Sequence, residues 1–362
     1  MPVPVDTLWE IEPHTIAKHE ILRRYLGAWF VIMGQTNRRI IYLDGFCGPG
    51  RYKKGEDGSP IIALKIALEH NSHQRIGEAS FIFIDEKQDR VLYLEDEIQL
   101  LYIPHNFHVS TFFNQFENTL NDILDSLEAK GAKLAPTFAF IDPFGFKGAP
   151  YKLVQRLLQN SKTEIFINIM ADSINRFLEH PNPQITHHII ELFGTIDVLQ
   201  IINSSGDRIV QLKQLYQEQL AKNAKYVRFF EMRDENNRPI YYLFFATNNR
   251  LGHVKMKEAF WKVDHASGYK FSDATNPHQL VLFEDDPSKD LAEQLACRFS
   301  KKKVVVFTIK TYVEDETPFT TSHMKKALCS LEEQDRICVE PCKQNGAKRV
   351  IHTFPNDVIV SF

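Results

Sequence analysis

The sequence predicts an α/β protein: a doubly wound, mostly parallel sheet that ends in an antiparallel hairpin, followed by a small α+β domain. Short apolar runs rich in Phe, Ile and Val alternate with helical periodicities, which is typical of a parallel sheet covered on both faces. Two later runs are joined by only a short polar segment, which predicts a hairpin. Residues 291–362 then read as three helices and two strands, the order of a winged helix.

Length and composition are those of a globular protein of about two domains. The chain has 362 residues, with 43% hydrophobic and 25% charged residues, ordinary values for such a protein. The formal net charge of −3 gives no global basic field that would favour nucleic acid, although it leaves a local basic patch open. The N-terminus has no signal-peptide pattern, no apolar run reaches membrane-spanning length, and the five cysteines do not form a disulfide pattern. We therefore expect a cytoplasmic protein.

Periodicity places each element of the first domain. The helices expected here are 14–33, 60–68, 89–101, 115–127, 149–158, 207–221 and 253–263. The strands expected are 40–44, 79–84, 107–112, 137–141, 164–170, 225–232 and 239–247. The polar segment 234–237 joins the last two as an antiparallel hairpin, so we expect seven strands of which five are parallel.

A change in composition marks the domain boundary. We expect a first domain at residues 1–265, a linker at 266–290 and a winged-helix-like domain at 291–362. Within the last, the helices are expected at 291–300, 304–313 and 321–332, and the strands at 336–341 and 348–353, around the turn 343–346. Lys325 and Lys326 on the third helix are candidates for contact with RNA or DNA, and protein contact is the alternative.

A glycine-rich loop follows the first predicted strand. Glycine lets the backbone turn sharply and approach a ligand closely, and an acid at the strand end is suited to a cationic amine such as that of S-adenosylmethionine. The spacing to the next helix departs from G-x-G-x-x-G and disfavours a dinucleotide; a tight turn without a ligand is the alternative. The candidate cofactor-binding residues of this loop are Asp44, Gly45, Phe46, Gly48 and Gly50.

Polar residues at the next two strand ends extend this candidate site. Asp85 and Glu86 end the second strand, where an acid is placed to bind the ribose hydroxyls of a nucleoside. Asn114 follows the third strand and is a candidate for the adenine amino group. Solvated strand-end or turn residues are the alternative for all three.

An acidic corner ends the fourth strand, with Asp142, Pro143 and Phe144 followed by Gly145. The Asp142 carboxylate and the Pro143 carbonyl are acceptors that orient an amino nitrogen for attack, and Phe144 is suited to stack on a base. The corner is similar to the Asp/Asn-Pro-Pro-Tyr/Phe corner of amino-group methyltransferases, but it lacks the second proline. A proline turn with Phe144 in the core is the alternative.

Other candidates lie on helices and near the fifth strand. His14 and Lys18 share one face of the first helix and are candidates for substrate phosphate or carboxylate, with a solvated face as the alternative. Asn168 and Arg176 are candidates for the border of the substrate cleft. No metal is expected, because the spacing of the late Cys and His residues favours core thiols over zinc; these residues are His323, Cys329, Cys338, Cys342 and His352.

Several of these segments together resemble the three-Cys-motif partner protein family. They are Lys18–Tyr25 in the first helix, the run Asp44–Tyr52, Gly58–Pro60, Ile141–Gly145, and Ala246–Asn248 with Gly252. The resemblance implies a Rossmann-like, seven-stranded class I methyltransferase sheet with a C-terminal winged-helix-like domain. It also implies a companion three-Cys protein of a radical-S-adenosylmethionine kind, encoded nearby in bacteria and mobile elements. Arg51 and Tyr52, which end the loop motif, are further candidates for substrate contact.

These observations favour an S-adenosylmethionine-dependent methyltransferase that methylates a nucleobase amino group in RNA or DNA, acting with a three-Cys-motif partner. One alternative is a non-catalytic or weakly catalytic adaptor that binds this partner. A further alternative is a methyltransferase for protein or a small molecule.

Overall fold

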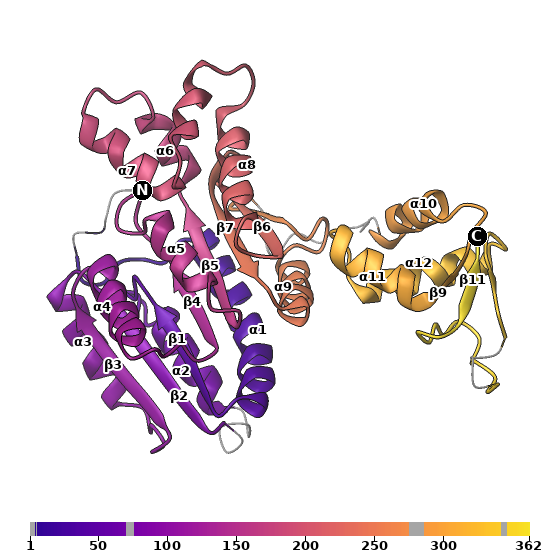
Figure 1. Ribbon diagram of the computed structural model, residues 1–362, viewed down its shortest axis with the longest axis horizontal. Helices are drawn as coiled ribbons and strands as arrows, with labels where there is room; N and C mark the ends of the chain where they lie inside the picture. The colour runs from indigo at the N-terminus through magenta and orange to yellow at the C-terminus, as the bar shows by residue number, and fades with distance from the viewer. Residues whose placement is uncertain (1–3, 5, 70–75, 275–285, 342–345) are drawn as a thin grey trace. The chain divides into compact units, whose positions relative to one another are not determined.

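The computed structural model describes residue 4 and residues 6–69, 76–274, 286–341 and 346–362. The chain divides into two compact units (Figure 1): the larger holds residues up to Ala259 together with 270–276, and the smaller holds residues 260–269 and 277–362. The predicted linker, 266–290, contains more structure than expected. It holds strand β8 (Lys270–Ser272) and the start of helix α10 (Ser288–Arg298), and its residues 275–285 lie outside the described residues.

Among the described residues, eight strands form the sheet of the larger unit, in the order β3-β2-β1-β4-β5-β7-β6-β8. The first five are parallel to one another, and β7 is antiparallel to both β5 and β6. The bounds are β1 Arg39–Asp44, β2 Glu78–Asp85, β3 Phe107–Phe113, β4 Thr137–Ile141, β5 Thr163–Ile169, β6 Tyr226–Arg233 and β7 Pro239–Thr247.

This arrangement confirms the predicted Rossmann-like class I methyltransferase sheet with its terminal antiparallel hairpin. The eighth strand was not predicted. β8 adds parallel to β6, pairing Glu231 with Lys270, and is too short to give a period-2 signal.

Helices cover both faces of the sheet (Figure 1). Those predicted from periodicity are present, with ends shifted by a few residues: α1 Pro13–Thr36, α2 Ser59–Glu69, α3 Gln88–Gln99, α4 Phe116–Ala129, α5 Tyr151–Leu158, α8 Arg208–Ala221 and α9 Arg250–Val263. Three helices between β5 and α8 were not predicted. They are α6 Ala171–Phe177, α7 Pro183–Phe193 and the 3₁₀ helix η2 Ile196–Asn203.

Strand side chains alternate between an aromatic and an aliphatic face. On the aromatic face, Tyr42 and Phe138 stack with their ring centroids 6.1 Å apart. Tyr25 of α1 packs there too, with its ring centroid 5.3 Å from that of Phe138. On the opposite face Leu43 and Ile141 join the core under α4, α5, α7 and α8. Because both faces are buried, the strands read as continuous apolar runs in the sequence.

The smaller unit has its own hydrophobic core and the helices of the predicted winged helix. Its helices are α10, α11 (Val306–Glu316) and α12 (Thr321–Glu333). Thr320 and His323 form a capping box at the start of α12. Three short strands, β9 Lys303–Val305, β10 Cys338–Val339 and β11 Ile359–Ser361, form one sheet in the order β10-β11-β9.

The predicted second wing strand, 348–353, is wrong. Among its residues only Lys348 makes a bridge, and the partner of β10 is β11, which begins six residues after the predicted strand ends. Val350 and Ile351 gave the strand-like signal, but each is 71% exposed. Residues 343–345 of the predicted turn lie outside the described residues.

Among the described residues, no single helix has the length and apolar character to cross a membrane. Taken together, α7 and η2 are long and apolar enough for a span, but the chain bends by 112° between them.

Candidate active site at the carboxyl edge of the sheet

The glycine loop and the acidic corner lie side by side. β1 and β4 are neighbours in parallel register, with Asp44 opposite Phe140, so their carboxyl ends meet at the same edge. The amide of Gly45 donates to the carbonyl of Phe140 at 2.9 Å. Parallel strands open their ligand crevice at this edge, so the fold brings together the two segments singled out in the sequence.

Asp44 is fully buried beneath the loop. Its carboxylate accepts hydrogen bonds from the backbone amide of Phe46 at 3.4 Å and the hydroxyl of Tyr42 at 3.3 Å. Burial raises the pKa of Asp44 to about 7, although a hydrogen bond from Ser59 works in the opposite direction. The side chain of Asp44 supports the loop from behind and does not belong to the lining of the cavities beside the loop. A direct bond from Asp44 to a ligand amine stays a prediction.

Asp85 also holds the loop. Its two carboxylate oxygens accept from the amides of Gly48 at 3.0 Å and Lys87 at 2.9 Å. Burial raises the pKa of Asp85, partly offset by the bond from Lys87. Glu86, the next residue, is exposed and lines a cavity, so of the two predicted ribose acids Glu86 is the one that faces open space.

Close packing explains two glycines of the loop. A Cβ at Gly45 would lie 2.5 Å from the ring of Phe116, and a Cβ at Gly50 would lie 2.6 Å from Leu94. Gly50 also has φ = 76°, a conformation that other residues rarely adopt. The loop therefore requires glycine at both positions for its path between α2, α3 and α4.

A cavity of about 450 Å³ opens beside this loop, within the ~300–1,000 Å³ range of small-molecule sites. Gly45 and Phe46 of the loop line it, together with Glu86 and the first turn of α4. Phe46 packs on Phe116 with ring centroids 5.4 Å apart. The remaining lining residues are Asp85, Arg90, Gln115, Glu117, Phe144, Phe146, Lys147, Gly148, Pro150, His188, Glu191 and Leu192.

A second, much smaller compartment lies between the glycine loop and Asp142. Its volume is about 30 Å³. Phe46 and Phe144 line both compartments, so the two adjoin. Trp9, His19 and Tyr52 close the small one on its other sides, and burial together with the charges of Lys18 and Arg23 lowers the pKa of His19 to about 3.

Asp142 is held by two neighbours. One oxygen forms an ion pair with Lys18 of α1, and the other accepts from Asn168 of β5 at 2.8 Å. Lys18 is 6% exposed and lies over the ring of Tyr241 at 5.6 Å. Lys18, Asp142 and Asn168 thus form one cluster, assembled from three elements that are far apart in the sequence.

The rest of the corner is a tight turn. The Pro143 carbonyl, an expected acceptor for a substrate nitrogen, already accepts from the amide of Gly145 at 3.1 Å. Phe144 is 38% exposed and lines both compartments. It therefore lies at the cavity rather than in the core.

Three predicted site residues are otherwise engaged. Asn114 is not among the cavity-lining residues; its side chain accepts from the amide of Gln115 at 2.8 Å, and Gln115 lines the cavity instead. Arg51 lines the small compartment, but its guanidinium pairs with Asp57 and with Glu97 at 2.6 Å. Tyr52 lies next to Trp9, with the ring centroids 5.6 Å apart.

His14 and Arg176 line a different cavity, of about 570 Å³, near the start of α1 and the β6–β7 hairpin. The imidazole of His14 pairs with Asp273 at 2.7 Å and Glu12 at 3.0 Å. Burial alone lowers the pKa of His14, but these hydrogen bonds outweigh it and raise the pKa above its ordinary value. Acidic residues outnumber basic ones around this cavity; its charged residues are Glu12, His14, Asp172, Arg176, Asp234, Glu235, Arg238 and Asp273.

Sequence reasoning missed several residues of the site. Trp9 comes from a segment with no regular structure, and His188 and Glu191 come from α7, which was not predicted. Arg90 is 2% exposed and places its guanidinium 4.8 Å from the Trp9 ring. Only the spacing of Arg90 in α3, one turn after Glu86, offered a signal in the sequence.

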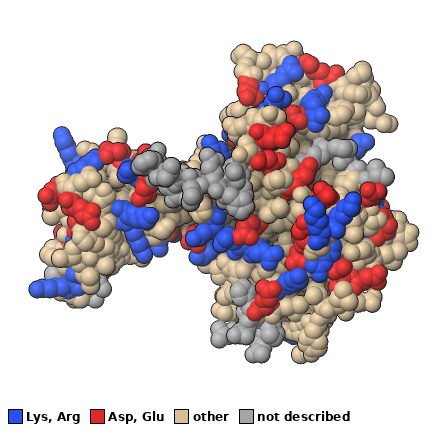
Figure 2. Space-filling model, turned by 180° about the vertical axis from the view of Figure 1, so that it is seen from behind, with Lys and Arg blue, Asp and Glu red and all other residues tan. Residues whose placement is uncertain are grey.

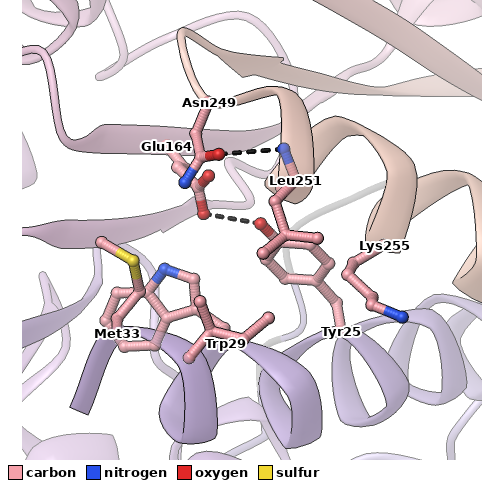
Figure 3. A pocket seen from close by; sticks show the side chains of 9 residues that line it. Tyr25, Trp29, Met33, Glu164, Asn249, Leu251 and Lys255 are labelled. Atoms are coloured by element: carbon pink, nitrogen blue, oxygen red, sulfur yellow. Dashed lines mark hydrogen bonds between the residues drawn. The ribbon is translucent and has the colours of Figure 1, made fainter. Parts of the chain in front are cut away.

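A separate cluster lies at the opposite edge of the sheet (Figure 3). Glu164, near the start of β5, accepts hydrogen bonds from Tyr25 at 2.5 Å and Thr247 at 2.9 Å. Burial raises the pKa of Glu164 to about 7, and the hydrogen bond from Tyr25 works in the opposite direction. Figure 3 shows Tyr25 and Trp29 projecting from α1 toward this carboxylate.

The late cysteines do not behave as expected core thiols. Cys338 is exposed, and Cys329 is half-buried with its Sγ 3.5 Å from Glu333. His352 lies beside Cys329 and Glu333, and the potential ligand atoms of these three residues lie within 4.8 Å of one another. His323 takes part in the capping box instead, and Cys342 lies outside the described residues.

Charge on the surface is mixed. Figure 2 shows Lys and Arg side chains interspersed with Asp and Glu on the face in view. In the smaller unit Lys325 and Lys326 of α12 are exposed, and Lys326 lies 4.0 Å from Asp286. Neither observation gives a field of one sign.

Comparison with known proteins identifies the second unit more closely than the first. A family model described as a GMT-like wHTH domain matches residues 268–344, in agreement with the winged-helix element order. A search of curated proteins finds no match.

Solved structures resembling the chain include methyltransferases. The complex of Trm1 from Pyrococcus horikoshii with S-adenosyl-L-methionine is 10% identical, with a TM-score of 0.37, covering 100% of this chain and 94% of that chain. The O-methyltransferase from Bacillus cereus in complex with SAH is 14% identical, with a TM-score of 0.35, covering 66% and 82%. The SAH-bound methyltransferase PaMTH1 from Podospora anserina is 9% identical, with a TM-score of 0.30, covering 66% and 89%. The fold assignment itself rests on the strand order and directions of the sheet.

Proposed function

We propose that the chain is an S-adenosylmethionine-dependent methyltransferase whose methyl donor lies across the carboxyl ends of β1, β2 and β4. The observation that carries the proposal is the juxtaposition of the Gly45–Gly50 loop, Glu86 and the Asp142–Phe144 corner around two adjoining compartments of about 450 Å³ and about 30 Å³. In open α/β sheets a ligand binds at this edge, where the strand order reverses.

The adenosine part of the donor fits the large cavity. Glu86 is exposed at the end of β2, where its carboxylate can accept hydrogen bonds from two ribose hydroxyls. Phe46 and Phe116 offer aromatic surface to the base, and Gln115 offers amide groups to its edge. A purine nucleoside is matched by this combination of one carboxylate, one amide and apolar walls.

The methyl acceptor that we propose is a nucleobase amino group in RNA or DNA. Phe144 presents an exposed ring for stacking beside the Asp142 carboxylate. The bound donor would supply the methyl group: the acceptor nitrogen would bond to the methyl carbon as the carbon–sulfur bond breaks, and Asp142 or water would take the proton that the nitrogen loses. Lys18 and Asn168 fix the orientation of Asp142, so the main contribution of the protein is alignment.

The winged helix and a partner protein complete the proposal. Lys325 and Lys326 on α12 are exposed and are proposed to contact nucleic-acid phosphates. The resemblance to the three-Cys-motif partner family supports a three-Cys protein as the companion in the same pathway.

An adaptor without catalysis is the second candidate, and one observation favours it. Both oxygens of Asp142 and the carbonyl of Pro143 already have partners within the chain. A corner whose acceptors are satisfied in this way retains ligand binding more readily than proton transfer. Under this alternative a stable complex with the three-Cys protein forms and no methyl group is transferred.

Calorimetric titration with S-adenosylhomocysteine tests the donor site. Glu86→Gln should weaken binding by about tenfold or more, because a hydrogen bond to a charged group contributes ~1.5–3 kcal/mol. Asp96→Asn, on the exposed surface of α3 and away from the cavity, is the matched control. Equal affinity in the Glu86 variant and the wild type would reject this site.

Transfer of a radiolabelled methyl group into fractionated cell extract tests the acceptor. Label that nuclease digestion releases supports a nucleic acid, and label that protease digestion releases supports a protein. Donor binding without any transfer, together with co-purification of the three-Cys protein, supports the adaptor.

A further inference from the structure

The two compartments at the carboxyl edge differ greatly in volume. The one beside Glu86 measures about 450 Å³, whereas the one between the glycine loop and Asp142 measures about 30 Å³. The smaller volume leaves room for about two or three water molecules. If adenosine occupies the large cavity, the amino-acid part of the donor has to enter the small one.

The indole of Trp9 forms part of the wall of the small compartment. Its ring lies edge-on to Tyr52 at 5.6 Å and to Phe144 at 6.0 Å. A Cβ placed on Gly48 would lie 3.5 Å from the indole, which puts the ring directly over the glycine loop. Trp9 therefore occupies the space next to the loop amides that a bound amino acid would use.

The segment that carries Trp9, residues 6–12, is named here the N-terminal strap. It has no helix or strand of its own. Hydrogen bonds attach it to the rest of the larger unit. The backbone N–H of Lys53 donates to the Trp9 carbonyl at 2.9 Å, and the Thr7 hydroxyl donates to the Asp89 carboxylate at 2.5 Å.

Just before the strap, the Pro4 carbonyl accepts from Lys87 at 2.8 Å and from Arg90 at 2.9 Å. Within the strap, Glu10 lies 3.6 Å from Lys54, and the Trp9 ring lies 4.8 Å from the Arg90 guanidinium. None of these anchors is a strand pairing or a bond within a helix. A segment held by few bonds and lacking regular structure opens at low free-energy cost.

Resting on the proposed function, we propose that the N-terminal strap is a gate over the methyl-donor site, with Trp9 as the residue that closes it. The closed strap admits adenosine to the large cavity and excludes the amino-acid part of the donor. Entry of the whole donor requires Trp9 to leave the loop. Trp9 is thus a residue that controls access and selects between whole and truncated ligands.

Titration of the full chain with two ligands tests the gate. Adenosine fits while the N-terminal strap is closed, whereas S-adenosylhomocysteine requires the strap to open. If the open form makes up ~10% or less of the free protein, a typical minor population, Trp9→Ala should bind S-adenosylhomocysteine about tenfold more tightly. Its affinity for adenosine should stay within about twofold.

A second variant separates gating from the simple removal of a ring. Thr7→Val loses the bond to Asp89 but keeps Trp9, so it should change the affinity for S-adenosylhomocysteine in the same direction and by less. Leu100→Ala, at a side chain that is 77% exposed, is the control and should match the wild type with both ligands.

Tryptophan emission gives an independent readout. Trp29 and Trp261 are 3% and 6% exposed, so a red shift on ligand binding should come from Trp9. S-adenosylhomocysteine should produce the shift, adenosine should not, and Trp9→Phe should abolish it.

Unchanged or weaker binding of S-adenosylhomocysteine in both Trp9→Ala and Thr7→Val, with adenosine still bound, overturns the gate and leaves the donor site standing. Absence of binding of both ligands to every variant overturns the donor site, and the gate with it. The two failures are therefore distinguishable.

Discussion

At the scale of single residues, the strand-end acids fall into two kinds. Asp44 and Asp85 are buried and hold the glycine loop through backbone amides, whereas Glu86 is exposed at the cavity. A buried carboxylate that accepts several hydrogen bonds stabilises a loop by giving its amides partners. The conformation of the loop thus depends on side chains that need not touch a ligand.

Gly252 illustrates how one close approach fixes a residue type. A Cβ at this position would lie 2.1 Å from the Glu164 carboxylate and 2.9 Å from the Tyr25 hydroxyl. Helix propensity alone predicts that Gly252→Ala in α9 stabilises by up to ~1 kcal/mol. We expect the opposite sign, a loss of ~1–3 kcal/mol from overpacking, measured by guanidinium unfolding. A stabilised variant would show that α9 moves aside without cost.

Glu164 makes the stability of the larger unit depend on pH. Its pKa rises from an ordinary 4.5 to about 7 on folding, first because it is buried, so the folded state binds the proton more tightly than the unfolded state. The stability contributed by this proton is fully present below the unfolded pKa and is lost as pH rises through the folded pKa. Glu164→Gln cannot titrate, and the variant should lack this loss.

Between about pH 5 and about pH 8, the wild type should therefore lose stability relative to Glu164→Gln, by an amount on the order of a few kcal/mol. The measurement is the unfolding free energy at a series of pH values. Asp44, whose pKa is also about 7, is present in both proteins and cancels in the difference. Parallel curves for the two proteins would contradict this assignment.

At the scale of elements, the segment α6–α7–η2 changes what the sheet edge can bind. α7 contributes His188, Glu191 and Leu192 to the wall of the large cavity. Loops and insertions at this edge commonly carry specificity, because the sheet beneath them is rigid. We therefore expect these three helices to be the part of the larger unit that selects the methyl acceptor.

Helix α12 of the smaller unit carries two neighbouring exposed lysines, Lys325 and Lys326. If Lys325 and Lys326 contact phosphates, changing both to Ala should weaken binding to a generic RNA or DNA duplex. It should also reduce the slope of log affinity against log salt by about 2. Lys130→Ala with Lys133→Ala, at exposed positions after α4, is the charge-matched control. A slope equal to the wild type would favour protein contact by this helix.

At the scale of the whole molecule, each unit has a hydrophobic core of its own. The core of the smaller unit draws on α10, α11 and α12, and it includes Trp261, from the last turns of α9. The Trp261 indole donates to the Pro318 carbonyl at 2.8 Å and stacks on Phe319. Trp261, on the last turns of α9, is thus a core residue of the smaller unit.

Trp261→Ala should therefore destabilise the smaller unit selectively. Removal of a buried tryptophan costs ~3–5 kcal/mol, so calorimetry should show one unfolding transition shifted to lower temperature and the other unchanged. In this variant the remaining fluorescence comes from Trp9 and Trp29, both in the larger unit, and should report an unaltered transition. A common shift of both transitions would indicate that the units unfold together.

Most elements with a long apolar pattern were found, but α7 was missed although Ile189, Leu192 and Phe193 recur at helical spacing. Very short elements gave no periodic signal at all. Helices such as α1 and strands such as β4 follow from apolar patterns that burial on both sheet faces imposes. β8 and β11 have three residues each, too few for such a pattern. The apolar pair Val350 and Ile351 predicted a strand wrongly, because exposure cannot be read from residue type alone.

Seven strands of the sheet, the longer helices around them and the two bends that border the candidate site could be predicted from the sequence alone, because glycine, proline and apolar periodicity act locally on the backbone. Only the tertiary structure decided which acids face the cavity, that Lys18 and Asn168 hold Asp142, and that Trp9 covers the loop. These contacts join segments separated by tens to more than a hundred residues. No local pattern records them, because they depend on how the chain packs.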